Sequence, residues 1–479
     1  MRQATRRRRR RSSLALGLVL AAVALTGAAR PRDGFDRRSG HLESALLDAV
    51  QAQHFDRVVD FGPIEGACPG SPWCPSPAAT IAHMPNIDLA VIALDRSGRP
   101  RAVADVLVSR DYPDGIGVPI GDDLGTDDVR WRRWNPDRWN GGTFSDTDGS
   151  RTTTVGWKDN PPLTPADDIV ADREEAPIEF MAPYPASTFK LLVAFHTLRL
   201  VDRGTVALDQ PYRYAPPDGP AMTRTTRELL DRMITESDND SAKALVKQLH
   251  DLGEIDPLNQ GLRDLDLTTL QVNGTDPASG AKWGIGQITM TSLDTARLLL
   301  LVNGGRGVLW RTPSGKPVRA DVLSRDSRAI LRGLLADQGW NDILTTANWC
   351  GRPYPTAGIP SLVADRWVDP GTGTVSVADK AFGQDVRPCN ERAEVAFAHK
   401  TGFTYNYLAD AGIVRSFSGP SGDYIVVMMS NLGYRYGDPA QAAVAKPVCG
   451  DDPGNDDGVC YTEKFAALGR SVDAILRRR

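Results

Sequence analysis

Hydrophobic positions recur at helical spacing in several separate stretches of the chain. Leucine and alanine follow this spacing near the start, and apolar residues of the middle part follow it before glycine or asparagine turns. Glycine just after the last periodic residue is a typical helix end. The stretches predicted as helices are 42–50, 187–202, 224–235, 240–252, 292–302, 325–335 and 462–476.

Apolar runs of strand length occur near both ends of the chain. A run over 87–94, a turn over 95–98 and a second run towards Val108 predict a hairpin. The later runs predicted as strands are 393–401, 409–416 and 424–431. Strands at both ends of a helical middle favour one α+β domain whose sheet is completed by the C-terminal part.

Two stretches have no hydrophobic period. Residues 109–175 are rich in Gly, Pro, Asp, Thr and Trp, and residues 353–390 are similarly loop-rich. Long loops without secondary structure are uncommon inside compact domains. We therefore interpret both stretches as insertions in a single domain spanning 40–479, and we expect tryptophans to pack the first of them.

Composition is ordinary for a globular chain. Hydrophobic residues make up 41% and charged residues 24% of the 479 residues, so a sizeable core is expected. The formal net charge of -4 gives no general attraction to nucleic acid, and no nucleic-acid partner is expected. The six histidines show no His-x-His or His-x-x-x-His spacing, and no cysteine pair has zinc-site spacing. Neither a metal nor another cofactor is therefore expected.

The first residues have the order of a secretory signal. An unbroken basic run, Arg6 to Arg11, precedes an apolar stretch, Leu14 to Leu25, and small residues follow it. The apolar stretch is short for a membrane span, so we predict a signal over 1–29 that is cleaved near Ala29, with an uncleaved anchor as the alternative. The arginines also permit twin-arginine export. The mature protein is expected to be secreted or held in the cell envelope, outside the cytoplasmic membrane.

The cysteines are even in number and fall as local neighbours. In an exported chain this arrangement predicts disulfides that close short or moderate loops. The predicted pairs are Cys68 with Cys74, Cys350 with Cys389, and Cys449 with Cys460.

The helix predicted over 187–202 begins with Ser187 and carries Lys190 three residues later, before an apolar series. Positions three apart share one helix face, so the amine can lie beside the hydroxyl. A buried lysine is costly unless something uses it, and burial lowers its pKa until the neutral amine can accept the serine proton. The N–H groups at a helix start also favour developing negative charge.

Two further short motifs follow in the chain. Ser237-Asp238-Asn239 lies between two predicted helices, and Lys400-Thr401-Gly402 lies on a predicted strand. Each motif alone has an ordinary interpretation. Ser187, Asp238 and Asn239 can be helix caps, and the two lysines can lie at the surface. The stretch from Ser279 to Lys282 also fits the first pattern, but we interpret it as a decoy because no apolar helix follows it. The joint order, with 50 residues between Ser187 and Ser237, favours chemistry.

In this order the motifs resemble those of the penicillin-recognising serine hydrolases, most closely the class A β-lactamases. The resemblance covers about 85–110 and 177–479, apart from the insertions. It implies a β-lactamase/transpeptidase-like α+β fold, with an antiparallel sheet flanked by terminal helices and a mostly helical subdomain. It also implies that the protein acts on a small-molecule β-lactam or a peptidoglycan stem peptide. We expect a monomer in association with the cell wall.

The resemblance also implies a role for each motif residue. Ser187 would be the acylated nucleophile, Lys190 its base, and Ser237 the relay of a proton to the leaving nitrogen. Asn239 would hold the substrate amide, and Lys400, Thr401 and Gly402 would form the strand that binds its carboxylate. The backbone N–H groups of Ser187 and Phe403 would form the oxyanion hole. His399, next to Lys400 on the strand, should face the opposite side and pack.

One feature of the resembling family is missing. Class A β-lactamases carry a loop glutamate that activates the deacylating water, but no glutamate occurs between Glu254 and Glu391. Asp276 could replace it, Lys190 could serve in both steps as a carbamate, or deacylation could be slow. The first hypothesis is therefore an exported β-lactamase acylated at Ser187, and the alternative is a D-alanyl-D-alanine peptidase or penicillin-binding protein. A non-catalytic cell-wall binder would have little need for the nucleophile and base together.

Overall fold

A computed structural model describes most of the chain. The described residues are 32–60, 79–81, 83–135, 164–352, 356–404, 406–419, 422–433, 436–438, 440 and 463–477. The predicted signal and the cysteine pairs Cys68 with Cys74 and Cys449 with Cys460 lie outside them. None of the helices within them has the length and apolar character that a membrane crossing requires.

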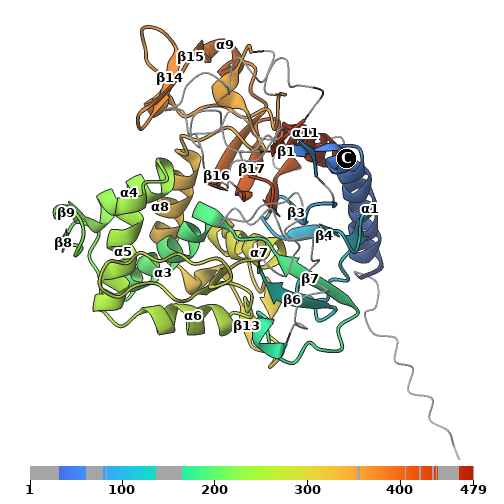
Figure 1. Ribbon diagram of the computed structural model, residues 1–479, viewed down its shortest axis with the longest axis horizontal. Helices are drawn as coiled ribbons and strands as arrows, with labels where there is room; N and C mark the ends of the chain where they lie inside the picture. Colours follow the sequence, from blue (N-terminus) through green and yellow to red (C-terminus); the bar gives the residue numbers. More distant parts are fainter. Residues whose placement is uncertain are drawn as a thin grey trace, which may run out of the picture.

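A six-stranded antiparallel sheet forms the centre of the molecule, with strand order β16-β17-β18-β3-β4-β5 (Figure 1). Its strands are β3 (Ile87–Leu94), β4 (Pro100–Val108), β5 (Ile116–Gly117), β16 (Val395–Phe403), β17 (Leu408–Ser416) and β18 (Tyr424–Ser430). The hairpin β3–β4 pairs with β18, which comes from the far end of the chain. The predicted hairpin and the completion of the sheet by the C-terminal strands are confirmed.

Helices cover both faces of this sheet, which explains why β3 and β18 are buried along their whole length. On one face, α1 (Arg32–Gln51) lies against β4 and contacts α11 (Lys464–Arg477). On the other face, α7 (Ser292–Asn303) lies against β3, β17 and β18, while α8 (Arg325–Ala336) lies against β16. The predicted α+β fold, with terminal helices flanking an antiparallel sheet, is therefore correct.

The middle of the chain is mostly helical, as predicted. Its helices besides α7 and α8 are the 3-10 turn η3 (Ala186–Phe189), α3 (Lys190–Asp202), α4 (Thr226–Thr235), α5 (Asn239–Asp251) and α6 (Ile255–Arg263). Helix α6 was not expected, because Pro257 and Gly261 interrupt its pattern. Pro257 lies in the first turn, where backbone N–H groups have no helical partner. A Cβ at Gly261 would lie 2.5 Å from a guanidinium nitrogen of Arg199, so glycine permits this close approach.

Short elements connect these parts. The short strands are β1 (Val59–Asp60), β2 (Ala79–Thr80), β8 (Pro211–Tyr214), β9 (Met222–Thr225), β10 (Gln271–Val272), β11 (Ile288–Thr289), β12 (Trp310–Arg311), β13 (Pro317–Val318) and β19 (Tyr436–Gly437). The other 3-10 turns are η1 (Phe55–Arg57), η2 (Pro165–Asp167), η4 (Ala320–Val322), η5 (Ala347–Trp349) and η6 (Asp365–Trp367). One cluster of buried side chains runs through the large sheet and the helices.

The first insertion is held against the sequence that leads to Ser187. Strand β6 (Val129–Arg133) pairs in parallel with β7 (Ile178–Ala182), and Trp131 lies opposite Phe180 in this pair. Their rings meet edge-on at 5.8 Å between centroids. Trp131 and Trp134 are both buried, so tryptophans pack the described part of this insertion, as expected.

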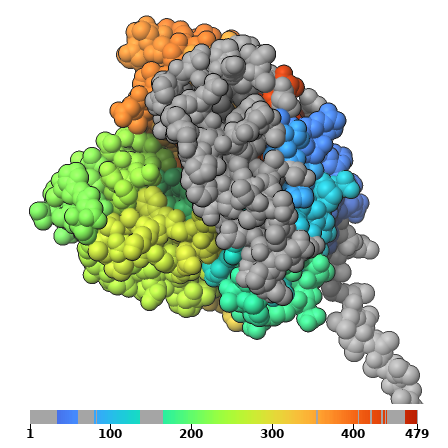
Figure 2. All heavy atoms as spheres, viewed as in Figure 1, coloured from blue at the N-terminus to red at the C-terminus, as the bar shows by residue number. Residues whose placement is uncertain are grey.

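The second insertion forms a small unit that we call the disulfide-closed subdomain, residues 356–390 together with Cys350. It contains the hairpin β14 (Thr374–Val377) and β15 (Lys380–Asp385) and the single turn α9 (Arg387–Asn390). The predicted disulfide between Cys350 and Cys389 is present. The hairpin was not expected because Ala378 takes the positive φ of 48° that glycine or asparagine usually supplies. The subdomain projects beyond the helices as a lobe (Figure 2).

Candidate active site

Ser187 lies in a tight turn between β7 and α3. Ala186 before it has φ of 46°, a conformation that costs energy for a residue with a Cβ. Ser187 is partly exposed, whereas Ala186 and Thr188 beside it are buried. No side chain caps this turn, so the helix-cap interpretation of Ser187 is wrong. The turn presents a serine hydroxyl at the start of a helix.

Lys190 is completely buried, with an exposed fraction of 0%. Its amine donates to the backbone oxygen of Ser237 at 2.6 Å, to Asn239 Oδ1 at 2.7 Å and to Ser237 Oγ at 3.3 Å. Burial, and then the neighbouring charge of Lys400, lower its pKa well below the ordinary value. The surface interpretation of Lys190 is therefore wrong. All three bonds lead to the second motif rather than to Ser187. A catalytic hydrogen bond, such as one between Lys190 and Ser187, often forms fully only when substrate is bound.

The second motif connects α4 to α5. Ser237 has φ of 60°, so its backbone is in the left-handed region. Asp238 caps α5 by accepting the N–H of Ser241 at 2.7 Å, which confirms the cap interpretation for this residue. Asn239, the first residue of α5, instead directs its side-chain oxygen to Lys190. Two residues of this motif therefore contact the buried amine.

Lys400 contacts the same serine. Its exposed fraction is 0%, so the interpretation as an exposed strand lysine is wrong. Its amine donates to Ser237 Oγ at 2.8 Å and to the backbone oxygen of Thr401 at 2.8 Å. Burial lowers the pKa of Lys400 to about 7. Ser237 thus lies between two buried amines from two other motifs, which is the arrangement that proton relay through a hydroxyl requires.

Gly402 permits the third motif to approach the turn that carries Ser187. A Cβ at this position would lie 2.4 Å from the backbone oxygen of Pro185 and 2.7 Å from the N–H nitrogen of Thr188. Thr401 is buried beside it and Phe403 is partly buried. The close approach brings the end of β16 next to Ser187, where the resemblance expects the N–H of Phe403. The structure therefore brings all eight predicted site residues into one region.

A loop closed at its neck by β10 and β11 covers residues 273–287. Asp276 accepts the hydroxyl of Ser279 at 2.6 Å and the N–H of Ala278 at 3.4 Å, so its described side-chain bonds stay within this loop. The stretch from Ser279 to Lys282 lies in the same loop and forms no helix, which agrees with its interpretation as a decoy.

Trp283 in this loop was missed at the level of sequence. Its ring lies 5.7 Å from the Lys190 amine and 5.0 Å from the ring of Phe189. The Tyr184 hydroxyl donates to its backbone oxygen at 3.1 Å, and its indole N–H donates to Gly280 at 2.9 Å. Among the described residues, Lys190 therefore contacts an aromatic ring but forms no hydrogen bond to a carboxylate. A tryptophan in a glycine-rich loop without an apolar run was the available signal.

His399 is fully buried, as its packing interpretation requires. Its ring stacks on Phe397 with centroids 4.1 Å apart. It also lies 2.7 Å from Asp410 Oδ1 and 3.1 Å from Asn341 Oδ1, so it supports the strand that carries Lys400 by hydrogen bonding as well as by packing.

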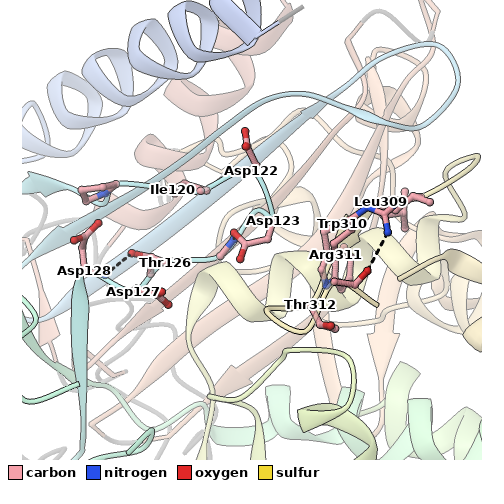
Figure 3. A pocket seen from close by; sticks show the side chains of 15 residues that line it. Ile120, Asp122, Asp123, Thr126, Asp127, Asp128, Leu309, Trp310, Arg311 and Thr312 are labelled. Atoms are coloured by element: carbon pink, nitrogen blue, oxygen red, sulfur yellow. Dashed lines mark hydrogen bonds between the residues drawn. The ribbon is translucent and has the colours of Figure 1, made fainter. Parts of the chain in front are cut away.

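A separate cavity of about 830 Å³ lies between the loop 119–128 and the segment 308–315. Figure 3 shows Asp122, Asp123 and Asp127 on one side of it and Arg311 on the other. None of its lining residues belongs to the three motifs. Its carboxylates do not converge, since no group of three or more metal-ligating His, Cys, Asp or Glu side chains occurs among the described residues. This cavity is therefore distinct from the site around Ser187.

Comparison with known proteins gives one family match. Residues 181–357 match the family described as "Beta-lactamase enzyme family", a range that contains the first two motifs and ends before Lys400. No curated protein sequence matches the chain significantly. Among solved structures, PBP-A is 20% identical over 62% of this chain and 82% of its own, with a TM-score of 0.37. A β-lactamase from Chitinophaga pinensis is 17% identical over 61% and 85%, with a TM-score of 0.36. The class A β-lactamase of the last common ancestor of Gram-negative bacteria is 16% identical over 91% and 98%, with a TM-score of 0.39.

Proposed function

We propose that this chain is a serine hydrolase that opens β-lactam rings through an acyl-enzyme on Ser187. The observation that carries the proposal is the position of Ser237 between the buried amines of Lys190 and Lys400. Two neighbouring lysine amines are costly to bury in a fold that needs them only for packing. The family match over the first two motifs supports the same chemistry.

Acylation follows from this arrangement. The Ser187 oxygen forms a bond to the lactam carbonyl carbon, and its proton passes to the amine of Lys190, whose lowered pKa favours the neutral form that can accept it. The ring C–N bond then breaks, and the nitrogen takes a proton through Ser237. The N–H groups of Ser187 and Phe403 would stabilise the developing oxyanion. Protonated Lys400 and the hydroxyl of Thr401 would bind the substrate carboxylate, and Asn239 would bind its amide.

The surroundings of Lys190 favour a second candidate, a penicillin-binding protein or D-alanyl-D-alanine peptidase that deacylates slowly. The side-chain bonds of Asp276 stay within its loop, and the ring of Trp283 lies next to the Lys190 amine. Release of the acyl group requires a base that activates water. None of the described hydrogen bonds of Lys190 goes to a carboxylate that could be this base. Asp276 and a carbamate on Lys190 stay hypotheses for that base.

We also propose that the protein works outside the cytoplasmic membrane as a monomer, after cleavage near Ala29. The basic and apolar order of the first residues supports export. The disulfide between Cys350 and Cys389 also suits an oxidising compartment. In that compartment the protein would meet β-lactams and peptidoglycan stem peptides.

The test is the intact mass of the protein after mixing with benzylpenicillin, followed from seconds to hours beside nitrocefin hydrolysis. We expect a covalent adduct of the penicilloyl mass. An adduct that clears with steady nitrocefin turnover supports the β-lactamase, and an adduct that persists without turnover supports the slow-deacylation candidate. Absence of any adduct would overturn both.

A further inference from the structure

Trp340 contacts three parts of the molecule that are far apart in the sequence. Its indole N–H donates to the backbone oxygen of Glu236 at 2.7 Å, in the peptide directly before Ser237. Its ring meets Phe403 edge-on with centroids 5.9 Å apart. On a third side it meets Phe382 of the disulfide-closed subdomain at 6.3 Å. One side chain thus joins the second motif, the third motif and the subdomain.

The disulfide-closed subdomain fixes the segment that carries Trp340. A Cβ at Gly339 would lie 2.5 Å from Val377 Cγ1, so the subdomain packs directly on this backbone. The indole N–H of Trp367 donates to the backbone oxygen of Asp337 at 2.7 Å. Trp340, Val377 and Phe382 belong to one small buried cluster, apart from the main core. The position of Trp340 therefore depends on the subdomain as well as on the main core.

The same subdomain holds the helix that leads to Ser237. Arg366 forms ion pairs with Asp231 of α4 at 2.8 Å and with Asp337 at 3.3 Å. The N–H of Gly339 donates to the backbone oxygen of Thr235, the last residue of α4, at 2.9 Å. The last turns of α4, which lead to Ser237, are thus held at Asp231 and at Thr235.

This support matters because Ser237 has a costly backbone conformation. A left-handed φ for a residue with a Cβ persists only where the surroundings hold it. The hydroxyl must also stay within hydrogen-bonding distance of both Lys190 and Lys400. A displacement of about 1 Å in such a constellation can slow a reaction by about 100-fold.

We infer that the disulfide-closed subdomain is a positioning element of the active site and that Trp340 is the positioning residue through which it acts. Trp340 holds the peptide before Ser237 through its N–H and the end of β16 through Phe403. The effect on acylation rests on the proposed function. The effect of Trp340 on the position of the two motifs can be measured without any substrate.

Trp349 offers a matched control. It lies in the same cluster, with the same 6% exposure as Trp340, and meets Phe382 edge-on at 4.9 Å. Its indole N–H has no hydrogen-bond partner in the described structure. Trp349→Phe therefore disturbs the same small core but removes no bond to the motifs, while Trp340→Phe removes the bond to Glu236.

The first measurement is the rate of acylation by benzylpenicillin, followed by intact mass, together with thermal unfolding. We expect Trp340→Phe to acylate about 10-fold more slowly and still reach full labelling, with an unfolding midpoint close to that of Trp349→Phe. The control should acylate within about twofold of the unaltered protein. Equal slowing in both variants, or incomplete labelling of Trp340→Phe at long times, would show a merely structural role and overturn the inference.

The second measurement is backbone hydrogen exchange without substrate. We expect faster exchange in peptides covering 233–241 and 400–404 for Trp340→Phe, and changes confined to the subdomain for Trp349→Phe. The double variant Cys350→Ala with Cys389→Ala, which keeps Trp340, should show the same faster exchange in 233–241 and 400–404. If benzylpenicillin leaves no adduct, the proposed function fails but exchange still decides this inference. Unchanged exchange in 233–241 would refute it.

Discussion

Among the described residues, a pair of lysines and a pair of aspartates are each buried close together. Lys190 and Lys400 converge on Ser237, each with an exposed fraction of 0%. Asp88 of β3 and Asp105 of β4 lie in the central sheet, also at 0%. Burial acts on both pairs in the same sense, because it disfavours the charged form. It lowers the pKa of both lysines and raises the pKa of both aspartates.

The surroundings of the two pairs differ. Asp88 accepts the N–H of Ser292 at 2.8 Å at the start of α7, where Asp294 and Arg297 pair at 2.8 Å, and every one of these groups is buried. The basic pair instead borders the partly exposed Ser187 and the exposed Asn239. A shifted pKa alone therefore does not mark a functional site. The candidate site differs from the acidic pair in having the partly exposed hydroxyl of Ser187 beside it.

The largest expected effect comes from removing the proposed base. Lys190→Gln should slow acylation by benzylpenicillin at least about 1000-fold, because no neutral amine then accepts the Ser187 proton. Lys316→Gln is the matched control, since this lysine is exposed in the turn between β12 and β13 and lies outside the three motifs. Intact-mass time courses measure both rates. Equal acylation rates in the two variants would show that Lys190 is not the base.

The pH dependence of acylation should follow Lys400. Its amine must be charged to bind a substrate carboxylate, so with a pKa of about 7 the acylation rate should fall above that pH, by about tenfold per pH unit. Protonation of Lys190 should slow the reaction on the acid side, below its lowered pKa. Lys400→Arg keeps its charge and should lose the alkaline fall. A fall that persists in Lys400→Arg would assign it to another group.

The acidic pair should affect stability and leave acylation unchanged. The folded pKa of Asp88, about 6, and that of Asp105 both lie above the ordinary value, so the folded state binds extra protons. That stabilisation is present at low pH and is lost as pH rises through the folded pKa values. Asp105→Asn should therefore raise the free energy of unfolding by about 1–2 kcal/mol at pH 8 and change it little at pH 4. Denaturant unfolding at both pH values checks this, and a larger gain at pH 4 would contradict it.

Much of the fold could be predicted from local pattern. Periodicity located the central hairpin, the later strands and most helices, because their burial repeats along the sequence. Helix α6 and the hairpin β14–β15 were missed, since Pro257 in one and Ala378 in the other are unusual at their positions. Local rules fail where tertiary contacts hold an unfavourable residue in place.

The site was only partly predictable. The motif order selected Ser187, Lys190 and Lys400 as candidate site residues because the proposed chemistry needs those residue types. It did not identify Trp283 or Trp340, whose importance comes from contacts across long stretches of sequence. Nor did it show that the Lys190 amine bonds to Ser237 and Asn239, since helix spacing reports only neighbours on one helix.

The most direct test of the central claim is to locate the penicilloyl group by peptide mapping of the adduct. We predict that the added mass falls on Ser187, within the peptide that also carries Lys190, and that Ser187→Ala remains folded and unlabelled. An adduct on another residue, or full labelling of Ser187→Ala, would contradict the account.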